Sequence, residues 1–406
     1  MSEKIATRVT SISNRSEPLL GSGGGGVASL GEVWRWGSDN MLPYALSLLA
    51  RRSVAHRRII NDKADYIAGK GVVCDERNLL LSGFVQSVNG DGETLRSIVA
   101  RLAMDEAMFG NAFLEVVTNA DREFLSLYHI DASKCRIAGD SQSVVLHHNW
   151  GSFNKAEAQR IALYPRFEAM EDGTMRTVVH YKDYEPMFSH YGVAPYVAGL
   201  DAAAIVYKTD RWNISRIDNS FQLSGVMLLD GVVDSEAEAD RMVRLAEEKF
   251  GGKPGQVLFV LRDSEAADSS SSRFVPIDTS SDGDWHSLHA QAESDLVVAH
   301  SWFRSLSGLD YASGFSSERI LHEYEVALNT VILPKQAQLL EPIRRIVGDV
   351  LGIDASSLDI VNRPPSRTKP SYMRIWEARK LDGLDYDENS AEQQRYLAEL
   401  GSRYGE

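Results

Sequence analysis

The sequence lacks the features that mark several classes of protein. Its 406 residues include only two cysteines, Cys74 and Cys135, which are too few for a disulfide framework and fit a reducing compartment. No apolar run approaches the roughly 18 residues of a membrane span. The opening residues, MSEKIATRVTS, do not have the pattern of a signal peptide. We therefore expect synthesis in the cytoplasm and no membrane association.

Motifs of catalysis are also missing. The sequence contains no G-x-S-x-G elbow, no H-E-x-x-H pair and no Walker lysine. The glycine-rich run at 21–26 has neither a strand before it nor a Lys-Ser/Thr after it, so it is a linker rather than a phosphate-binding loop. We expect no enzyme activity and no cofactor.

Positive charge is scarce as well. The chain has 43 Lys and Arg against 57 Asp and Glu, a net charge of −14. A protein that clamps DNA regardless of sequence needs a basic face to neutralise phosphates, so this net charge argues against such a clamp. A channel in which DNA slides without being gripped remains compatible with this charge.

Three histidines, His129, His147 and His148, lie in a segment with the alternation of strands. They have no cysteine or carboxylate partner at the spacing of a metal site. We interpret them as histidines on strand surfaces rather than as metal ligands.

A second group could hold a divalent metal. His286 and His289, with Asp282 and Glu293, share one face of an expected helix. That face lies beside an apolar stripe, so a polar surface is the favoured interpretation and no metal is expected.

An acidic group raises the alternative of a metal-dependent nuclease. It consists of Glu318, Glu323 and Glu325, together with His322. It lacks the spaced acidic pairs and the basic grip of phosphodiester cleavage. Acidic residues in the first turns of a helix explain it better.

The first half of the chain reads as helices followed by strands. A helix is expected from about Pro43, capped by Asp39 or Asn40, and others at 54–67 and 93–108. Strands are expected at 112–117, 124–130, 135–137, 144–148, 160–164 and 177–181.

The second half predicts a spike. Two long helices, 195–222 and 282–306, flank an insert in which strands 225–229 and 256–261 enclose a helix at 235–250, and a strand at 274–277 follows. A helix from Ser316 or Ser317 toward residue 351 should kink at 330–334, because Pro334 removes a backbone donor. A strand at 359–361 and a polar helix at 371–400 complete an α+β protein.

Taken in order, these blocks resemble the portal proteins of tailed phages, particularly the HK97-like branch, over residues 34–350. The resemblance is carried by WGSDNMLPYALSLLARRSVAHRRIINDKADYIAGKGV, FQLSGVM, WHSLHAQAESDLVVAHSWFRSLSGLDY and SERILHEYEVALNTVILPKQAQLLEPIRRIV. The family often has Val-Pro-Pro after the second stem helix, where this chain has Ser307-Gly308-Leu309-Asp310.

The resemblance implies a division of the chain into parts. A flexible arm (1–33) precedes the wing (34–195), stem helix one (196–222), the clip (223–278) and stem helix two (279–306). A tunnel loop (307–316), a kinked helix with the wing return (317–362) and a crown-like tail (363–406) follow. The tunnel-loop residues would be Gly308, Leu309, Asp310, Tyr311, Ala312, Ser313, Gly314 and Phe315, with Trp285, Leu288, Phe303 and Arg304 in the stem and Pro334 at the helix kink.

The same resemblance implies the function and the partners. It predicts a ring, generally of twelve subunits, at one capsid vertex of the virion, assembled in the host cytoplasm. Double-stranded DNA would pass through it during packaging and ejection. The partners would be the terminase large subunit, the head–tail adaptor and the major capsid protein. The alternative is a minor capsid or head–tail adaptor protein without a DNA channel.

Overall fold

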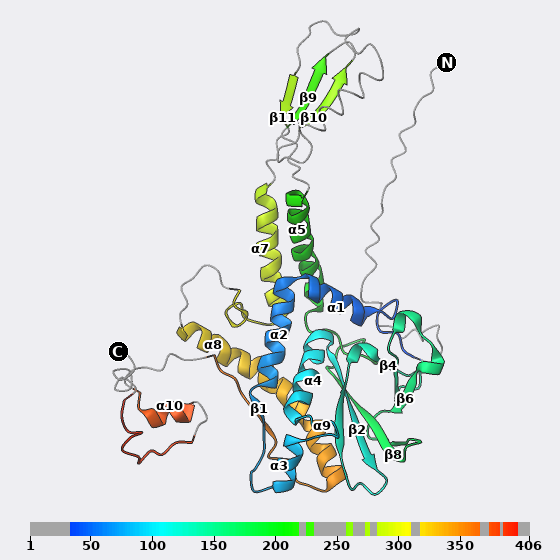
Figure 1. Cartoon of the computed structure of the whole chain (residues 1–406), viewed down its shortest axis with the longest axis vertical. Coiled ribbons are helices and arrows are strands. Elements are labelled where there is room, and N and C mark those ends of the chain that lie inside the picture. Colours follow the sequence, from blue (N-terminus) through cyan, green and yellow to red (C-terminus); the bar gives the residue numbers. More distant parts are fainter. Residues whose placement is uncertain are drawn as a thin grey trace.

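The computed structural model describes residues 33–218, 225–230, 257–262, 273–276, 282–309, 317–365, 373–381 and 385–396. A broad base of helices and sheets carries a stem of two helices that lie side by side, α5 (Leu200–Asp218) and α7 (Asp282–Ala299). A small sheet lies at the far end of the stem (Figure 1). This mixture of helices and strands confirms the predicted α+β class. The expected arm and the helix at 235–250 lie outside the described residues. Within the described residues, no helix is long and apolar enough to cross a membrane.

Four helices form one side of the base: α1 (Leu42–Arg52), α2 (Val54–Ala68), α3 (Leu79–Gln86) and α4 (Leu95–Phe109). The helix expected to begin near residue 43 and those expected at 54–67 and 93–108 are confirmed. Each predicted helix end lies within two residues of the observed one. The short α3, which begins where the Asn78 side chain accepts a hydrogen bond from the amide of Leu81, was not predicted.

The predicted cap of α1 was wrong. Neither Asp39 nor Asn40 caps the helix, because Met41 occupies the cap position and makes no side-chain bond. Asn40 instead has a left-handed backbone (φ 65°), and its side-chain oxygen accepts from Nε of the buried Arg136 (2.6 Å). A buried guanidinium needs acceptors for its donors, and this need decides where the Asn40 side chain points.

Two antiparallel sheets form the other side of the base. One has the order β3-β2-β8-β7, and the other the order β4-β5-β6. The expected strands are confirmed with small shifts of their ends. Their bounds are β2 Asn111–Asn119, β3 Ser126–Ile130, β4 Cys135–Ile137, β5 Ser143–Leu146, β6 Gln159–Ala162 and β8 Thr174–Lys182. The short strand β7, Glu168–Ala169, was not predicted.

The stem joins the base to the tip. Any side chain at Gly199 would force the two elements apart, because a Cβ there would lie 2.6 Å from Cβ of Ala299 on α7. Beyond the stem, β9 (Gly225–Asp230) pairs in parallel with β10 (Val257–Arg262) and antiparallel with β11 (Arg273–Pro276). The parallel pair agrees with the strand–helix–strand pattern, since parallel neighbours need a crossover between them.

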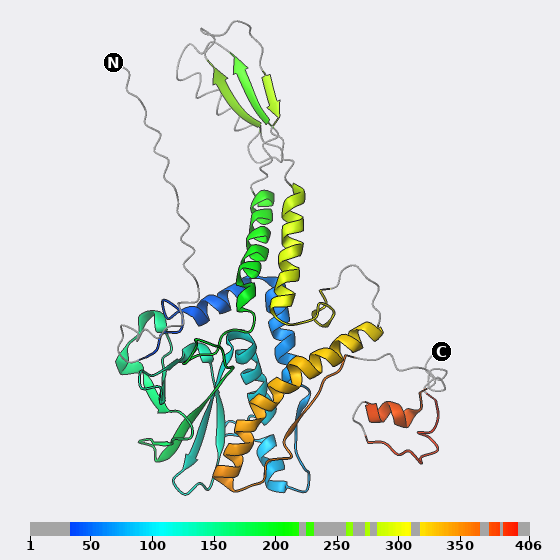
Figure 2. The same cartoon turned by 180° about the vertical axis from the view of Figure 1, so that it is seen from behind.

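The kinked helix consists of α8 (Ser317–Ala327), a π-helical turn (Leu328–Ile332) and α9 (Leu333–Leu351), and it crosses the base below the stem (Figure 2). The irregularity at 328–332 directly precedes Pro334, in the place where the sequence predicted a kink. Proline cannot donate the backbone bond of a regular turn, and a π-turn accommodates this loss.

The C-terminal part differs from expectation. The strand β12 (Asp359–Val361) is confirmed and pairs with β1 (Gly71–Val73). The long polar helix expected at 371–400 was wrong: α10 covers only Ile375–Leu381, and 385–396 contains turns. Asp385 explains part of this, because its carbonyl accepts from Arg379 Nε (2.6 Å) and folds the chain back on α10.

Two glycines with left-handed backbones allow a matched test of this packing. A Cβ at Gly110 (φ 65°) would lie 2.1 Å from the Val193 carbonyl oxygen, whereas a Cβ at Gly92 (φ 73°) would meet nothing within 4 Å. We expect Gly92→Ala to cost about 1 kcal/mol of the free energy of unfolding. Gly110→Ala should cost about 3 kcal/mol or more, because backbone must move. Denaturant unfolding measures both, and equal losses would contradict this account.

Candidate functional site at the base of the stem

The second stem helix ends earlier than predicted. Helix α7 stops at Ala299 instead of continuing to Leu306, and Ser301 then takes a left-handed backbone (φ 49°). The turn buries Trp302, whose indole nitrogen donates to Ser307 Oγ (3.0 Å). Trp302 packs with Tyr66 of α2, at 5.8 Å between ring centroids. The helix therefore ends where its aromatic residue can enter the core.

The turn also brings together two histidines that are 244 residues apart. His56 Nδ1 on α2 and His300 Nε2 lie 2.9 Å apart, both rings are buried, and Tyr196 packs against both. Burial, with a smaller effect of Arg57, lowers the pKa of His56 to about 4. Burial, with the charges of His56 and Lys63, lowers the pKa of His300 well below its ordinary value. Both rings are neutral at pH 7.

The predicted tunnel loop begins inside this folded turn. Gly308 (φ 65°) ends a single 3-10 turn, Ser305–Ser307, and the following Leu309 is buried in the core around the stem base. The Leu309 amide donates to the Arg304 carbonyl (3.0 Å). The other loop residues, Asp310, Tyr311, Ala312, Ser313, Gly314 and Phe315, lie outside the described residues.

The predicted stem residues occupy different environments. Phe303 is half-buried against the core at the stem base, and Arg304 donates to Glu293 Oε2 (2.8 Å) on α7. Trp285 stacks on Trp212 of α5 (5.1 Å), and Trp285 and Leu288 are 37% and 40% exposed. The apolar stripe of α7 is therefore buried near the base and exposed toward the tip.

One histidine group acquires a carboxylate that the sequence analysis did not find. Ligand atoms of His147, His148 and Glu157 lie within 4.8 Å of one another. Both ring nitrogens of His147, however, face backbone amides, those of Asn149 (3.1 Å) and Asn154 (3.2 Å). His147 is buried rather than on a surface, and its ring holds this loop together instead of facing a metal.

Three other candidates for chemistry, His129, His289 and Glu323, are paired with neighbouring side chains. His129 Nε2 contacts Asp105 Oδ2 (2.9 Å), and His289 Nε2 contacts Asp210 Oδ1 (3.4 Å). Within the acidic group, Glu323 accepts from Arg319 Nε (2.7 Å) and from the Ser305 hydroxyl. These pairs tie elements of the fold together.

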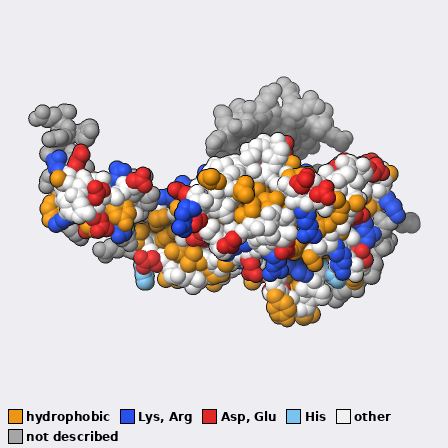
Figure 3. Space-filling model, turned by 90° about the horizontal axis from the view of Figure 1, so that it is seen from below, with side chains coloured by type: hydrophobic (Ala, Val, Ile, Leu, Met, Phe, Trp, Pro, Cys, Tyr) orange, Lys and Arg blue, Asp and Glu red, His pale blue; other side chains and the backbone are white. Residues whose placement is uncertain are grey.

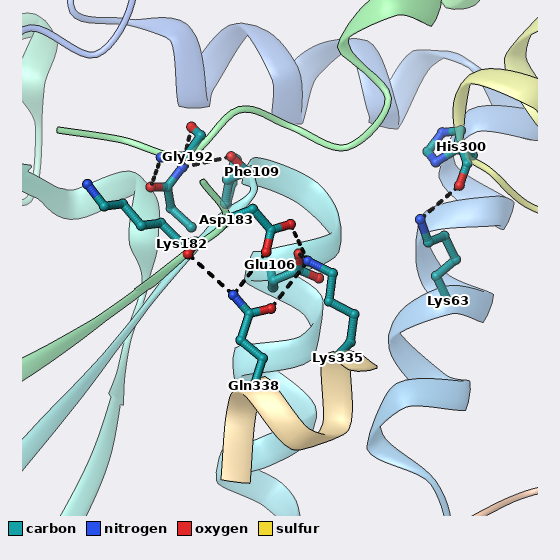
Figure 4. A network of polar contacts seen from close by, with 10 residues as sticks. Lys63, Glu106, Phe109, Lys182, Asp183, Gly192, His300, Lys335 and Gln338 are labelled. Atoms are coloured by element: carbon teal, nitrogen blue, oxygen red, sulfur yellow. Dashed lines mark hydrogen bonds and ion pairs between the residues drawn. The ribbon is translucent and has the colours of Figure 1, made fainter. Parts of the chain in front are cut away.

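Helix α9 is attached to the base by a partly buried ionic cluster (Figure 4). Lys335 Nζ contacts Glu106 of α4 and Asp183, the residue after β8. Gln338 Nε2 donates to Asp183 Oδ1 (2.9 Å). Burial alone would lower the pKa of Lys335, but these two carboxylates raise it above its ordinary value. Lysine 335 is therefore charged and held by partners from two other elements.

Another lysine, Lys63, is buried and binds the backbone of the turn after α7. Lys63 Nζ on α2 donates to the His300 carbonyl oxygen (2.9 Å). Burial lowers its pKa to about 8, although Glu106 acts in the opposite direction. Neither cluster was predicted, because its members have no common periodicity in the sequence.

Part of the chain matches a known protein family. Residues 91–267 match the sequence profile of the family described as "Phage portal protein". That segment contains the sheets of the base, α5 and the strands β9 and β10. The predicted resemblance to phage portal proteins is confirmed. The description of the matched family names a structural component of a phage particle rather than an enzyme.

Two solved structures, with TM-scores of 0.55 and 0.53, share this fold. The neck of a native gene transfer agent particle is 15% identical, with a TM-score of 0.55, covering 85% of this chain and 95% of that one. A chain from the virion of the native particle is also 15% identical, with a TM-score of 0.53 and coverages of 84% and 94%. An HK97 family phage portal protein from Corynebacterium diphtheriae is 14% identical, covers 83% and 96%, and has a TM-score of 0.46. A search of curated proteins gives no match.

The two buried histidines predict a loss of stability in acid. Because their folded pKa values lie below the unfolded value of about 6.5, their contribution is complete above that pH and is lost as pH falls toward 4. For His56 alone the loss is about 3 kcal/mol. Denaturant unfolding between pH 4 and 7 should show a flatter slope for the double variant His56→Gln/His300→Gln. The control His148→Gln, at an exposed ring, should keep the wild-type slope, and an unchanged slope in the double variant would contradict the assignment.

The ionic cluster predicts a large effect of a single neutral substitution. Lys335→Met leaves Glu106, which is 3% exposed, without its cation, and should cost about 3–5 kcal/mol of unfolding free energy. Adding Glu106→Gln should recover part of that loss. The exposed pair Glu341–Arg345 is the matched control, and Glu341→Gln should cost less than about 1 kcal/mol. Similar losses for Lys335→Met and Glu341→Gln would show that the cluster contributes little.

Proposed function

We propose that this chain is the subunit of a closed ring at one capsid vertex of a phage virion, and that DNA passes through the ring during packaging and ejection. The observation that carries the proposal is the stem, a pair of helices without a third layer to cover it. Its exposed apolar side chains include Val298, which is 76% exposed, and Ile214, which is 50% exposed. A helix pair buries such residues only against further helices, and head-to-tail packing of identical copies supplies them.

The proposed subunit number and location rest on similarity. The matching neck of the native gene transfer agent particle was computed with C12 symmetry, which supports a ring of twelve. The matches to particle and virion structures support a place in the virion. The major capsid protein would surround the base of the ring.

The charge of the chain suits passage of DNA. Each neutralised phosphate adds binding free energy that must be lost again when DNA moves one step. The net charge is −14, and the face seen in Figure 3 has acidic and basic side chains intermixed with apolar ones. A channel wall with this mixture of charges would offer few strong contacts to phosphate.

The parts of the chain receive roles within this proposal. The clip, 223–278, would face the terminase large subunit during packaging and the head–tail adaptor afterwards, because it is the insert at the far end of the stem. The residues from Asp310 to Phe315 would line the narrowest part of the channel, with Asp310 repelling phosphate. Trp285 and Leu288 would contact the stem of the neighbouring subunit. Pro334 would set the bend of the kinked helix (317–351), which would be the tunnel helix of the ring. The arm 1–33 and the tail 363–406 would lie outside the wing and the stem.

Ring formation is the direct test. Purified protein should appear in negative-stain images as rings with a central hole, and light scattering should give a mass of many subunits. Val298→Asp should abolish the rings, because it places a charge at an apolar contact, whereas Val298→Ala should retain them. Monomers or dimers under all salt and protein concentrations would overturn the proposal. Particles without a central hole would favour a minor capsid or adaptor protein.

A further inference from the structure

A cavity of about 350 Å³ lies in the base between β8, the segment that follows it and α9. Its volume lies in the range of small-molecule sites. Aliphatic side chains, among them Ile137, Leu163 and Val178, line part of it. The cations Lys182 and Arg345 line another part, and the residues around the cavity include no Asp or Glu.

The charge of Lys182 is not matched by a nearby carboxylate. Its ammonium group donates to the Ser189 carbonyl oxygen (2.5 Å), a neutral acceptor that leaves two of its three N–H donors. Figure 4 shows the Lys182 side chain directed away from the cluster of Glu106, Asp183 and Lys335. Burial lowers the pKa of Lys182, and burial together with the smaller effect of the Lys182 charge lowers the pKa values of His180 and His190.

The positive charge of Arg345, unlike that of Lys182, has a carboxylate partner. Arg345 contacts Glu341 Oε1 (3.3 Å), and both side chains are largely exposed. The nearby Asp349 accepts a hydrogen bond from the Tyr164 hydroxyl (2.5 Å). Lys182 is therefore the group in the cavity with a charge still to be neutralised, and Arg345 is a second cation at the α9 side.

The wall beside Lys182 offers further donors and a flat surface. The ring of His190 stacks on Trp34, with centroids 3.7 Å apart, and His190 Nδ1 lies 3.4 Å from the Ser141 hydroxyl. Ser141 and Ser189 also line the cavity. Hydrogen bonds from cations and hydroxyls to an oxyanion are among the stronger ones in proteins.

We propose that this cavity binds a small organic anion, with its carboxylate or phosphate at Lys182 and its apolar part against the aliphatic side chains. Because β8 and α9 bound the cavity from two sides, the ligand would tie the tunnel helix to the sheet. The proposal does not depend on ring formation.

Binding of probes to the full-length chain tests the proposal. Benzoate and phenyl phosphate distinguish a carboxylate from a phosphate site, and benzyl alcohol is the neutral probe of similar shape. Calorimetry should detect at least one anion and show binding at least tenfold weaker for benzyl alcohol. Lys182→Met should weaken anion binding at least tenfold, Lys182→Arg should retain most of it, and Lys208→Met, at an exposed lysine of α5, should leave it unchanged.

A second measurement remains useful if Lys182→Met does not fold. A bound anion restores the pKa of Lys182 toward its ordinary value, so binding at alkaline pH should take up protons. Calorimetry in two buffers with different ionisation enthalpies measures that uptake. Absence of anion binding, equal affinity for benzyl alcohol, wild-type affinity of Lys182→Met, or binding without proton uptake would each overturn the proposal.

Discussion

Helix α2 belongs to both large hydrophobic cores, and the arrangement of the remaining parts depends on it. Ile60, Ala64 and Ile67 lie in the core of the base, whereas Ala55 and Ile59 lie in the core that contains the foot of the stem. A helix with apolar residues on two sides has to be enclosed on two sides. The base and the foot of the stem therefore both pack on α2, and a displacement of α2 would change the packing of both.

The polar groups buried along α2 and α9 add direction to this packing. Apolar contacts tolerate sliding, but a buried ammonium group requires acceptors at defined positions. Lys63 finds one in the turn after α7, and Lys335 finds two, on α4 and after β8. These contacts place the end of the stem and the start of the tunnel helix relative to the base. In a proposed channel, this is the region where a change in one element would be transmitted to another.

Local signals explain how much of the fold could be predicted. Helices α2 and α4 both end at glycines with positive φ angles, Gly69 and Gly110. Glycine at the end of a helix is a signal that the sequence shows directly. Pro334 marks the irregular turn before α9. Two of the failures occurred where a distant contact competed with a local preference. The side chain of Asn40 serves Arg136 rather than the helix, and α7 stops so that Trp302 can be buried.

The sequence by itself determined the class of the fold, the order of its elements, the insert between two stem helices and the resemblance to portal proteins. It did so because periodicity, proline and glycine act within a few residues of where they stand. Only the tertiary structure decided that His56 meets His300, that Lys335 meets Glu106, and that Lys182 faces a cavity shared by β8 and α9. Such pairs are separated by up to 244 residues, and burial and charge compensation select them only after the chain has folded.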